Sequence, residues 1–218
     1  MTCRASFATA LLLLMTAGLS TAVASPIEIA FSNTASPGVP FRGPGCCQVG
    51  DEITLGGTAR SIVDVSWLID TANTDRVSGF ETWIYANDGL AGAPGTLLWD
   101  SGALIVHVSA TDTILDVTVP HVLVPDIITV TSFIFDVPNP AFGSLGRVFG
   151  GSPTVGSINA SWLEDSPGVW VQQSINPINP GFSVLAEPVP EPSTVWLILS
   201  GLVALGGLSR RGAALVGS

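Results

Sequence analysis

The chain has 218 residues, with 17 acidic side chains, seven arginines and no lysine, and its formal net charge is −10 at pH 7. The stretch from Ser25 to about Pro192 holds every acid but only four of the arginines, so its formal charge is 4 − 17 = −13. Proteins bind nucleic acid by neutralising phosphates with lysine and arginine. The composition therefore excludes nucleic acid as a partner, whereas divalent cations and neutral or cation-bridged polysaccharides are compatible with it.

The first 24 residues have the pattern of a secretory signal peptide. Arg4 precedes an apolar run from Ala8 to Leu19, and Ala22-Val23-Ala24 forms a small-x-small cleavage site before Ser25. A transmembrane anchor is the alternative, but an apolar run of about a dozen residues is shorter than a membrane span requires. We therefore predict a signal peptide over residues 1–24, with cleavage after Ala24.

Residues 25–187 are predicted to form one extracellular domain of short β-strands, because runs of apolar and β-branched residues alternate with turn-forming residues. The eleven predicted strands are Ile27–Phe31, Glu52–Leu55, Arg60–Asp70, Val77–Ala86, Thr96–Asp100, Leu104–Ser109, Ile114–Val119, Ile127–Phe135, Ser157–Leu163, Val169–Gln172 and Phe182–Ala186. In the most regular of them, one face is predicted to be formed by Val63, Val65, Trp67 and Ile69. No amphipathic helix separates the strands. The pattern predicts an all-β, antiparallel, jelly-roll-like β-sandwich, with a seven-stranded immunoglobulin-type sandwich as the alternative.

Residues 188–218 have a different character. Pro190-Glu191-Pro192 cannot lie inside a helix, because proline lacks the amide donor. Ser193–Ser209 carries no charge and is predicted to be a single transmembrane helix; 17 residues span about 25 Å, near the lower limit for a membrane. The residues expected to anchor it are Trp196, Leu197, Ile198, Leu199, Leu202, Val203, Leu205 and Leu208. Arg210 and Arg211 follow as a cytoplasmic basic stop. A buried helix of a soluble domain is the alternative for this run.

The order of these three pieces resembles the PEP-CTERM sorting signal of exported bacterial proteins. The resemblance rests on Pro190-Glu191-Pro192, the short apolar span and Arg210-Arg211, although Gly212 to Ser218 extend beyond the basic end that usually closes such tails. It implies an exosortase as processing partner, transient retention in the inner membrane, and onward delivery to the cell surface of a Gram-negative bacterium.

The middle of the chain resembles the choice-of-anchor type of extracellular β-domain, which occurs ahead of interchangeable anchoring tails. The residues that carry this looser resemblance are Gln48–Leu55, Ile62–Trp67, Trp83–Gly89 and Ala93–Leu98. It implies no activity that could be assigned to particular residues.

No arrangement typical of a catalytic site is visible in the sequence. His107 and His121 are expected to be exposed on or beside strands, and the serine-hydrolase and zinc-protease motifs are missing. The carboxylate pairs Asp51-Glu52 and Glu164-Asp165 are expected to be solvated turn residues rather than glycosidase acids. We therefore expect a protein that is not an enzyme.

Two kinds of binding site are nevertheless compatible with the sequence. Asn87-Asp88-Gly89 and Asp100 offer oxygen ligands for a structural calcium ion, without the spacing of an EF-hand. Trp162 and Trp170 flank a predicted hairpin turn and could stack on sugar rings, although tryptophans on strands more often belong to the core. Cys46 and Cys47 could form a vicinal disulfide, pair with other chains or remain free thiols.

The sequence thus predicts an exported, non-enzymatic protein of the cell surface or of an exopolysaccharide matrix, sorted through its tail. A carbohydrate-binding module, with or without structural calcium, is the alternative.

Overall fold

The computed structural model describes residues 26–35, 37–41, 47–111, 113–135, 137, 145–173 and 179–189. The predicted signal peptide and the predicted helix at 193–209 lie outside them. The described residues form thirteen strands and one short 3-10 turn, η1 (Leu90–Gly92). The strands are β1 (Glu28–Ser32), β2 (Pro40–Phe41), β3 (Val49–Thr54), β4 (Ser61–Asp70), β5 (Arg76–Ala86), β6 (Leu97–Asp100), β7 (Leu104–Val108), β8 (Ile114–Leu123), β9 (Ile127–Phe135), β10 (Gly146–Val148), β11 (Ser157–Ser166), β12 (Val169–Gln172) and β13 (Phe182–Glu187).

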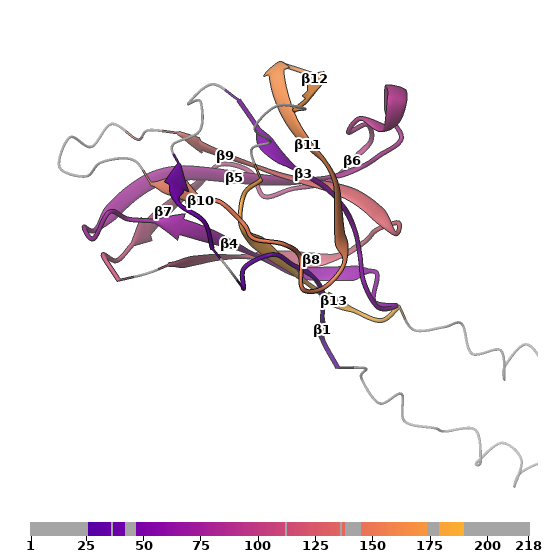
Figure 1. Ribbon diagram of the computed structural model, residues 1–218, viewed down its shortest axis with the longest axis horizontal. Helices are drawn as coiled ribbons and strands as arrows, with labels where there is room; N and C mark the ends of the chain where they lie inside the picture. Colours follow the sequence, from indigo (N-terminus) through magenta and orange to yellow (C-terminus); the bar gives the residue numbers. More distant parts are fainter. Residues whose placement is uncertain are drawn as a thin grey trace, which may run out of the picture.

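The strands make two antiparallel sheets, as the sequence predicted (Figure 1). The first sheet has the order β1-β13-β4-β10-β2, and β8 also pairs with β4. The second has the order β12-β11-β3-β9-β5-β6, and β7 also pairs with β5. The chain therefore crosses repeatedly between the sheets, and most of its pairings join segments that are distant in sequence.

Eight of the strands follow the connectivity of a jelly roll. Taken along the chain as β1, β3, β4, β5, β7, β8, β9 and β13, they stand in the order β1-β13-β4-β8 in one sheet and β3-β9-β5-β7 in the other. The remaining strands are additions: β2 and β10 extend the first sheet, β11 and β12 extend the edge of β3, and β6 pairs with the end of β5. This connectivity places the first and last strands side by side.

The core lies between the two sheets, and both contribute its largest side chains. Trp67 and Phe182 come from the first sheet, with ring centroids 4.9 Å apart, and Phe80 comes from the second, with its ring edge-on to Trp67 at 6.1 Å. All three side chains are almost completely buried. Burying such rings removes a large apolar area from water and holds the sheets together.

A bulge in β4 corrects one part of the prediction. Val65, Trp67 and Ile69 are buried as expected, but Val63 is only half-buried and Ile62 takes its place in the core. In the pairing of β4 with β13, Asp64 is opposite Leu185 and Ile62 is opposite Ala186, so Val63 is an extra residue of β4. Because an extra residue in a strand reverses the alternation of its faces, the pattern before the bulge is out of phase with the pattern after it.

Other differences concern short or polar elements. The sequence analysis did not predict β2 and β10, which have two and three residues. It placed the start of the second strand at Glu52, but β3 begins at Val49 and includes the buried Asp51. β3 pairs with β11 on one side and with β9 on the other, and its burial between them outweighs the low strand propensity of Gly50 and Asp51.

Candidate functional site

The last strand leads directly into the C-terminal segment, and neighbours hold it on both sides. β13 lies between β1 and β4, and its final residue, Glu187, is opposite Ser61. The Arg60 amide donates to the Glu187 carbonyl at 3.2 Å, and Glu28 of β1 is opposite Ala186. Figure 1 shows the start of β1 and the end of β13 leaving the sandwich together. We name this edge of the molecule, marked by Thr54, Ser61, Leu123, Ile127 and Glu187, the tail end.

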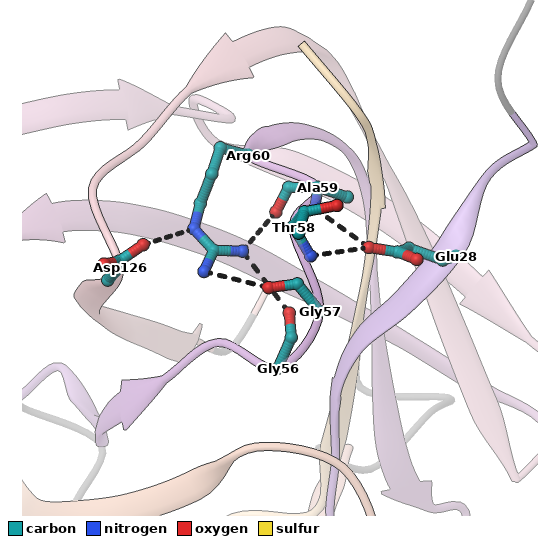
Figure 2. A network of polar contacts seen from close by, with 7 residues as sticks. All are labelled: Glu28, Gly56, Gly57, Thr58, Ala59, Arg60 and Asp126. Carbon is teal, nitrogen blue, oxygen red and sulfur yellow. Dashed lines mark hydrogen bonds and ion pairs between the residues drawn. The ribbon is translucent and has the colours of Figure 1, made fainter.

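Arg60 organises the tail end (Figure 2). Its Nε donates to Asp126 Oδ1 at 2.6 Å, and its terminal nitrogens donate to the carbonyl oxygens of Gly56, Gly57 and Ala59 at 2.6 to 3.3 Å. A guanidinium group with its donors in a fixed fork suits such a set of acceptors. The result is a tight loop between β3 and β4, closed against the start of β9.

Glu28 fixes the same loop from the other side. Its Oε1 accepts hydrogen bonds from the amides of Thr58 and Ala59 at 3.2 and 2.9 Å (Figure 2). An acidic side chain near the beginning of the first strand thereby joins β1 to the β3–β4 loop. The residue that starts the domain and the residue that ends it are thus connected through one polar network.

His121 belongs to this end as well. Its Nδ1 lies 3.3 Å from Glu187 Oε2, and its backbone has φ +53°. Both histidines are exposed, as the sequence predicted, and His107 stands on the solvent side of β7. The neighbour of His121 is therefore a carboxylate of the last strand.

The two tryptophans of the β11–β12 hairpin lie on the outer face of the second sheet. Trp162 is opposite Gln172 in the hairpin and opposite Gly50 in β3; its indole is 6% exposed, and Nε1 donates to Glu52 at 3.4 Å. Trp170 is half-buried and meets Tyr85 edge-on, with ring centroids 5.3 Å apart. Trp170 therefore offers more ring surface to a ligand than Trp162 does.

Tyr85 and Gln48 complete this aromatic cluster. The Tyr85 hydroxyl and the Thr131 hydroxyl both donate to Gln48 Oε1, at 3.1 and 2.9 Å. Burial raises the pKa of Tyr85 to about 12, so the phenol remains a donor at neutral pH. The cluster is thus a neutral, hydrogen-bonded surface rather than an ionised site.

The carboxylate pairs expected from sequence separate in the structure. Asp51 is fully buried inside the sandwich, whereas Glu52 points from the opposite face of β3 towards Trp162 and Asn159. Glu164 accepts from the Gly168 amide at 2.7 Å and so closes the hairpin turn, while Asp165 is exposed. Neither pair has both of its carboxyl groups facing a common space.

The interior holds two ionisable groups that the sequence analysis did not place there. Asp51 accepts from the Ser161 hydroxyl at 2.6 Å, while its Oδ2 has no partner; burial raises the pKa of this carboxyl well above its ordinary value, and the Ser161 hydrogen bond opposes the shift. Arg147 of β10 donates to the hydroxyl and carbonyl oxygens of Ser132, and burial lowers its pKa to about 10. No alternation pattern marks either residue as internal.

The residues proposed as calcium ligands form separate turns. Asp88 accepts from the amide and hydroxyl of Thr96 at 2.6 and 2.7 Å, and these hydrogen bonds lower its pKa. Asp100 accepts from the Gly102 amide at 2.6 Å. Within the described ranges, no group of three or more His, Cys, Asp or Glu side chains is placed to hold a metal ion.

The predicted sorting residues, from Pro190 to Arg211, lie outside the described part of the chain. Among the residues that are described, no helix has the length and apolarity needed to cross a membrane. Cys47 is disulfide-bonded, and the other two cysteines, Cys3 and Cys46, are not among the described residues.

The described residues thus form an all-β domain whose last strand, β13, ends at Glu187. Residues 188–211 match the PEP-CTERM protein-sorting motif. The chain therefore carries a PEP-CTERM sorting tail, which implies export, membrane-anchored sorting in a Gram-negative bacterium and processing by an exosortase. No curated protein and no solved structure shows significant similarity to the chain.

Proposed function

We propose that this protein is a non-enzymatic, exported β-sandwich that its PEP-CTERM tail sorts to the cell surface or into an exopolysaccharide matrix. A signal peptide over residues 1–24 would start export. The observation that carries the proposal is the position of the motif: it begins at residue 188, immediately after Glu187, the last residue of β13. The sorting signal is thus attached to a strand in the interior of the first sheet, so that a force on the tail acts on the folded domain as a whole.

The polar network at the tail end supports this role. Glu28, Arg60 and Asp126 fix the loop beside β13, and Arg60 also binds the Glu187 backbone. Interactions of this kind on partly buried backbone groups limit fraying of a terminal strand. We expect the domain to stay folded up to Glu187 while the tail is held and processed.

The test replaces Pro190-Glu191-Pro192 by three alanines in the full chain. We expect full-length protein to accumulate in the inner membrane, with a matching loss from the cell surface. The matched control replaces Asp165-Ser166-Pro167, an exposed stretch that likewise contains one acid but only one proline, and should leave delivery unchanged. Normal surface delivery of the tail variant would contradict the proposal. A second variant, Arg210→Ala with Arg211→Ala, should also retain the protein in the inner membrane.

Carbohydrate binding is the second candidate, and one observation favours it. The half-buried Trp170 ring lies beside Tyr85 and close to polar groups of Gln48 and Glu164. Aromatic faces next to amide and carboxylate groups suit sugar rings and their hydroxyls. Exopolysaccharide is then the expected partner of an exported matrix protein.

This candidate predicts retention of the purified protein on an exopolysaccharide column. Trp162→Ala combined with Trp170→Ala should abolish retention, whereas Val169→Ala combined with Val171→Ala, which changes the opposite face of β12, should not. Equal retention of both variants would exclude the hairpin tryptophans as the binding surface. Urea unfolding of each variant shows whether the fold is kept.

A further inference from the structure

The tail end of the sandwich brings together loops from both sheets. In the second sheet, Thr54 is opposite Ile127 and Ala86 is opposite Ile128, so the β3–β4, β5–β6 and β8–β9 loops meet there. In the first sheet, Ser61 is opposite both Leu123 and Glu187. The Leu55 amide donates to the Asp126 carbonyl, and the Val124 amide donates to the Arg60 carbonyl, at 2.9 Å in both cases. These bonds extend the β3–β9 and β4–β8 pairings into the β3–β4 and β8–β9 loops, which connect the two sheets at this edge.

Exposed apolar side chains gather at the same end. The described residues expose twelve large apolar side chains, and half of them belong to the tail end or to the loops beside it. These six are Ile27, Leu90, Leu97, Leu123, Ile127 and Val189. Leu90 is 95% exposed and Leu123 is 61% exposed, so both project from the surface. At the opposite end, where Ile114 is opposite Leu68, the exposed apolar residues are fewer: Val39, Ile105 and Ile114.

The acidic groups among these side chains are already engaged. Asp126 pairs with Arg60, Glu28 accepts two backbone amides, and Glu187 contacts His121. Asp88, beside Leu90, accepts two hydrogen bonds from Thr96. Groups with internal partners lose less on leaving water than free carboxylates do. The end therefore presents apolar side chains among carboxylates that already have partners.

The tail limits how far this end can lie from a membrane. Seven residues, 188–194, separate Glu187 from Val195, the first apolar residue of the predicted helix. Even a fully extended chain spans at most about 3.6 Å per residue, or roughly 25 Å over this segment. An anchored tail thus keeps the tail end close to the lipid headgroups.

We propose that the tail end rests on the phospholipid surface of the membrane that holds the tail, with Leu123, Ile127 and Leu90 entering the headgroup layer. This inference rests on the proposed function, because the tail supplies the proximity. Apolar side chains at an interface sink about 5–10 Å into the boundary between headgroups and acyl chains. The contact orients the sandwich upright, so that the hairpin with Trp170 faces away from the membrane.

The experiment places a fluorescent label at each end of the full chain. One protein carries Leu123→Cys and its matched control carries Ile105→Cys, at positions that are 61% and 56% exposed. The parent chain, labelled identically, gives the background from native cysteines. Each protein is reconstituted into phosphatidylethanolamine–phosphatidylglycerol vesicles that contain a lipid with a nitroxide near the top of its acyl chain, and the vesicles are isolated by flotation.

We expect the label at residue 123 to be quenched at least about twofold more than the label at residue 105, because only the former is expected at the depth of the nitroxide. Equal, weak quenching of both labels in floating vesicles overturns the inference but leaves the anchoring tail intact. Self-quenching at residue 123 without quenching by the nitroxide lipid would show a second copy of the chain at this end, and also overturns it. Protein that does not float contradicts the anchoring itself.

A pair of double variants tests the apolar contact independently of labelling. Leu123→Ser with Ile127→Ser should lower the vesicle partition coefficient of the full chain about tenfold, equivalent to about 1.4 kcal/mol. Ile105→Ser with Ile114→Ser should leave it unchanged. Equal partition of the two variants would contradict the proposed contact.

Discussion

The buried carboxyl of Asp51 makes the stability of the domain depend on pH in a defined direction. Asp51 is fully buried, and among the described residues only Ser161 donates a hydrogen bond to its carboxyl group, so burial raises its pKa well above the ordinary value near 3.8. The neutral acid is therefore favoured in the folded state. The stability that this preference provides is fully present below pH 3.8 and is lost as the pH rises towards and through the folded-state pKa.

Asp51→Asn keeps the shape of the neutral acid but cannot ionise, so it removes this dependence. One proton linked to unfolding changes the free energy of unfolding by at most about 1.4 kcal/mol per pH unit. Relative to the variant, the wild type should lose stability with up to this slope above pH 4, until the pH reaches the folded-state pKa. With a urea slope of about 1–3 kcal/mol per M, the midpoint difference grows by roughly 0.5–1.4 M per pH unit.

The assay is urea unfolding of both proteins, followed by tryptophan fluorescence, between pH 3.5 and 8. Subtracting the two curves cancels the other titrating groups. Asp88→Asn is the matched control: hydrogen bonds from Thr96 lower the pKa of Asp88, so its contribution is present at neutral pH and is lost only as the pH falls through that lowered value. A pH-independent difference between wild type and Asp51→Asn would refute the reasoning.

Three further substitutions test the packing. Arg147→Ala should reduce the free energy of unfolding by about 3 kcal/mol, because it opens a cavity and leaves the hydroxyl and carbonyl oxygens of Ser132 without their donor. Arg76 is only half-buried, so Arg76→Ala should reduce the free energy of unfolding by less in the same urea assay. Gly50→Ala should destabilise the protein by several kcal/mol, because the added Cβ would overlap the Val130 carbonyl oxygen and Thr131 Cα. Gly146→Ala is its control, because the new Cβ meets Asp70 at an ordinary 3.4 Å. Equal urea midpoints of the two variants would contradict this difference. Trp170→Ala should cost about 1 kcal/mol through loss of the Tyr85 contact, and an unchanged urea midpoint would show that the rings do not stabilise the hairpin.

The strands were largely predictable from sequence because alternation and turn residues are local signals. The predicted strand Val77–Ala86, for example, differs from β5 (Arg76–Ala86) by one residue. The pairing of β13 between β1 and β4 was not predictable, because no local pattern records contacts between residues more than 100 positions apart. The tail end could not be predicted from sequence for the same reason, because its loops are brought together by such long-range pairings.

The polar interior was predicted least well. Asp51 was expected in a solvated turn and Arg147 was given no position, since charged residues are rarely buried. Their burial follows from tertiary partners: Ser161 lies on β11, which neighbours β3, and Ser132 lies on β9 of the other sheet. The bulge that places Ile62 instead of Val63 in the core is similarly a property of the β4–β13 pairing rather than of the β4 sequence.

We infer that the tail of this protein is a transient sorting signal. The most direct test is intact-mass analysis of the protein recovered from the cell surface and the surrounding matrix. We expect a chain that has lost the apolar run and Arg210-Arg211, while full-length tails occur only in the inner-membrane fraction. Surface protein that still carries residues 193–211 would contradict it.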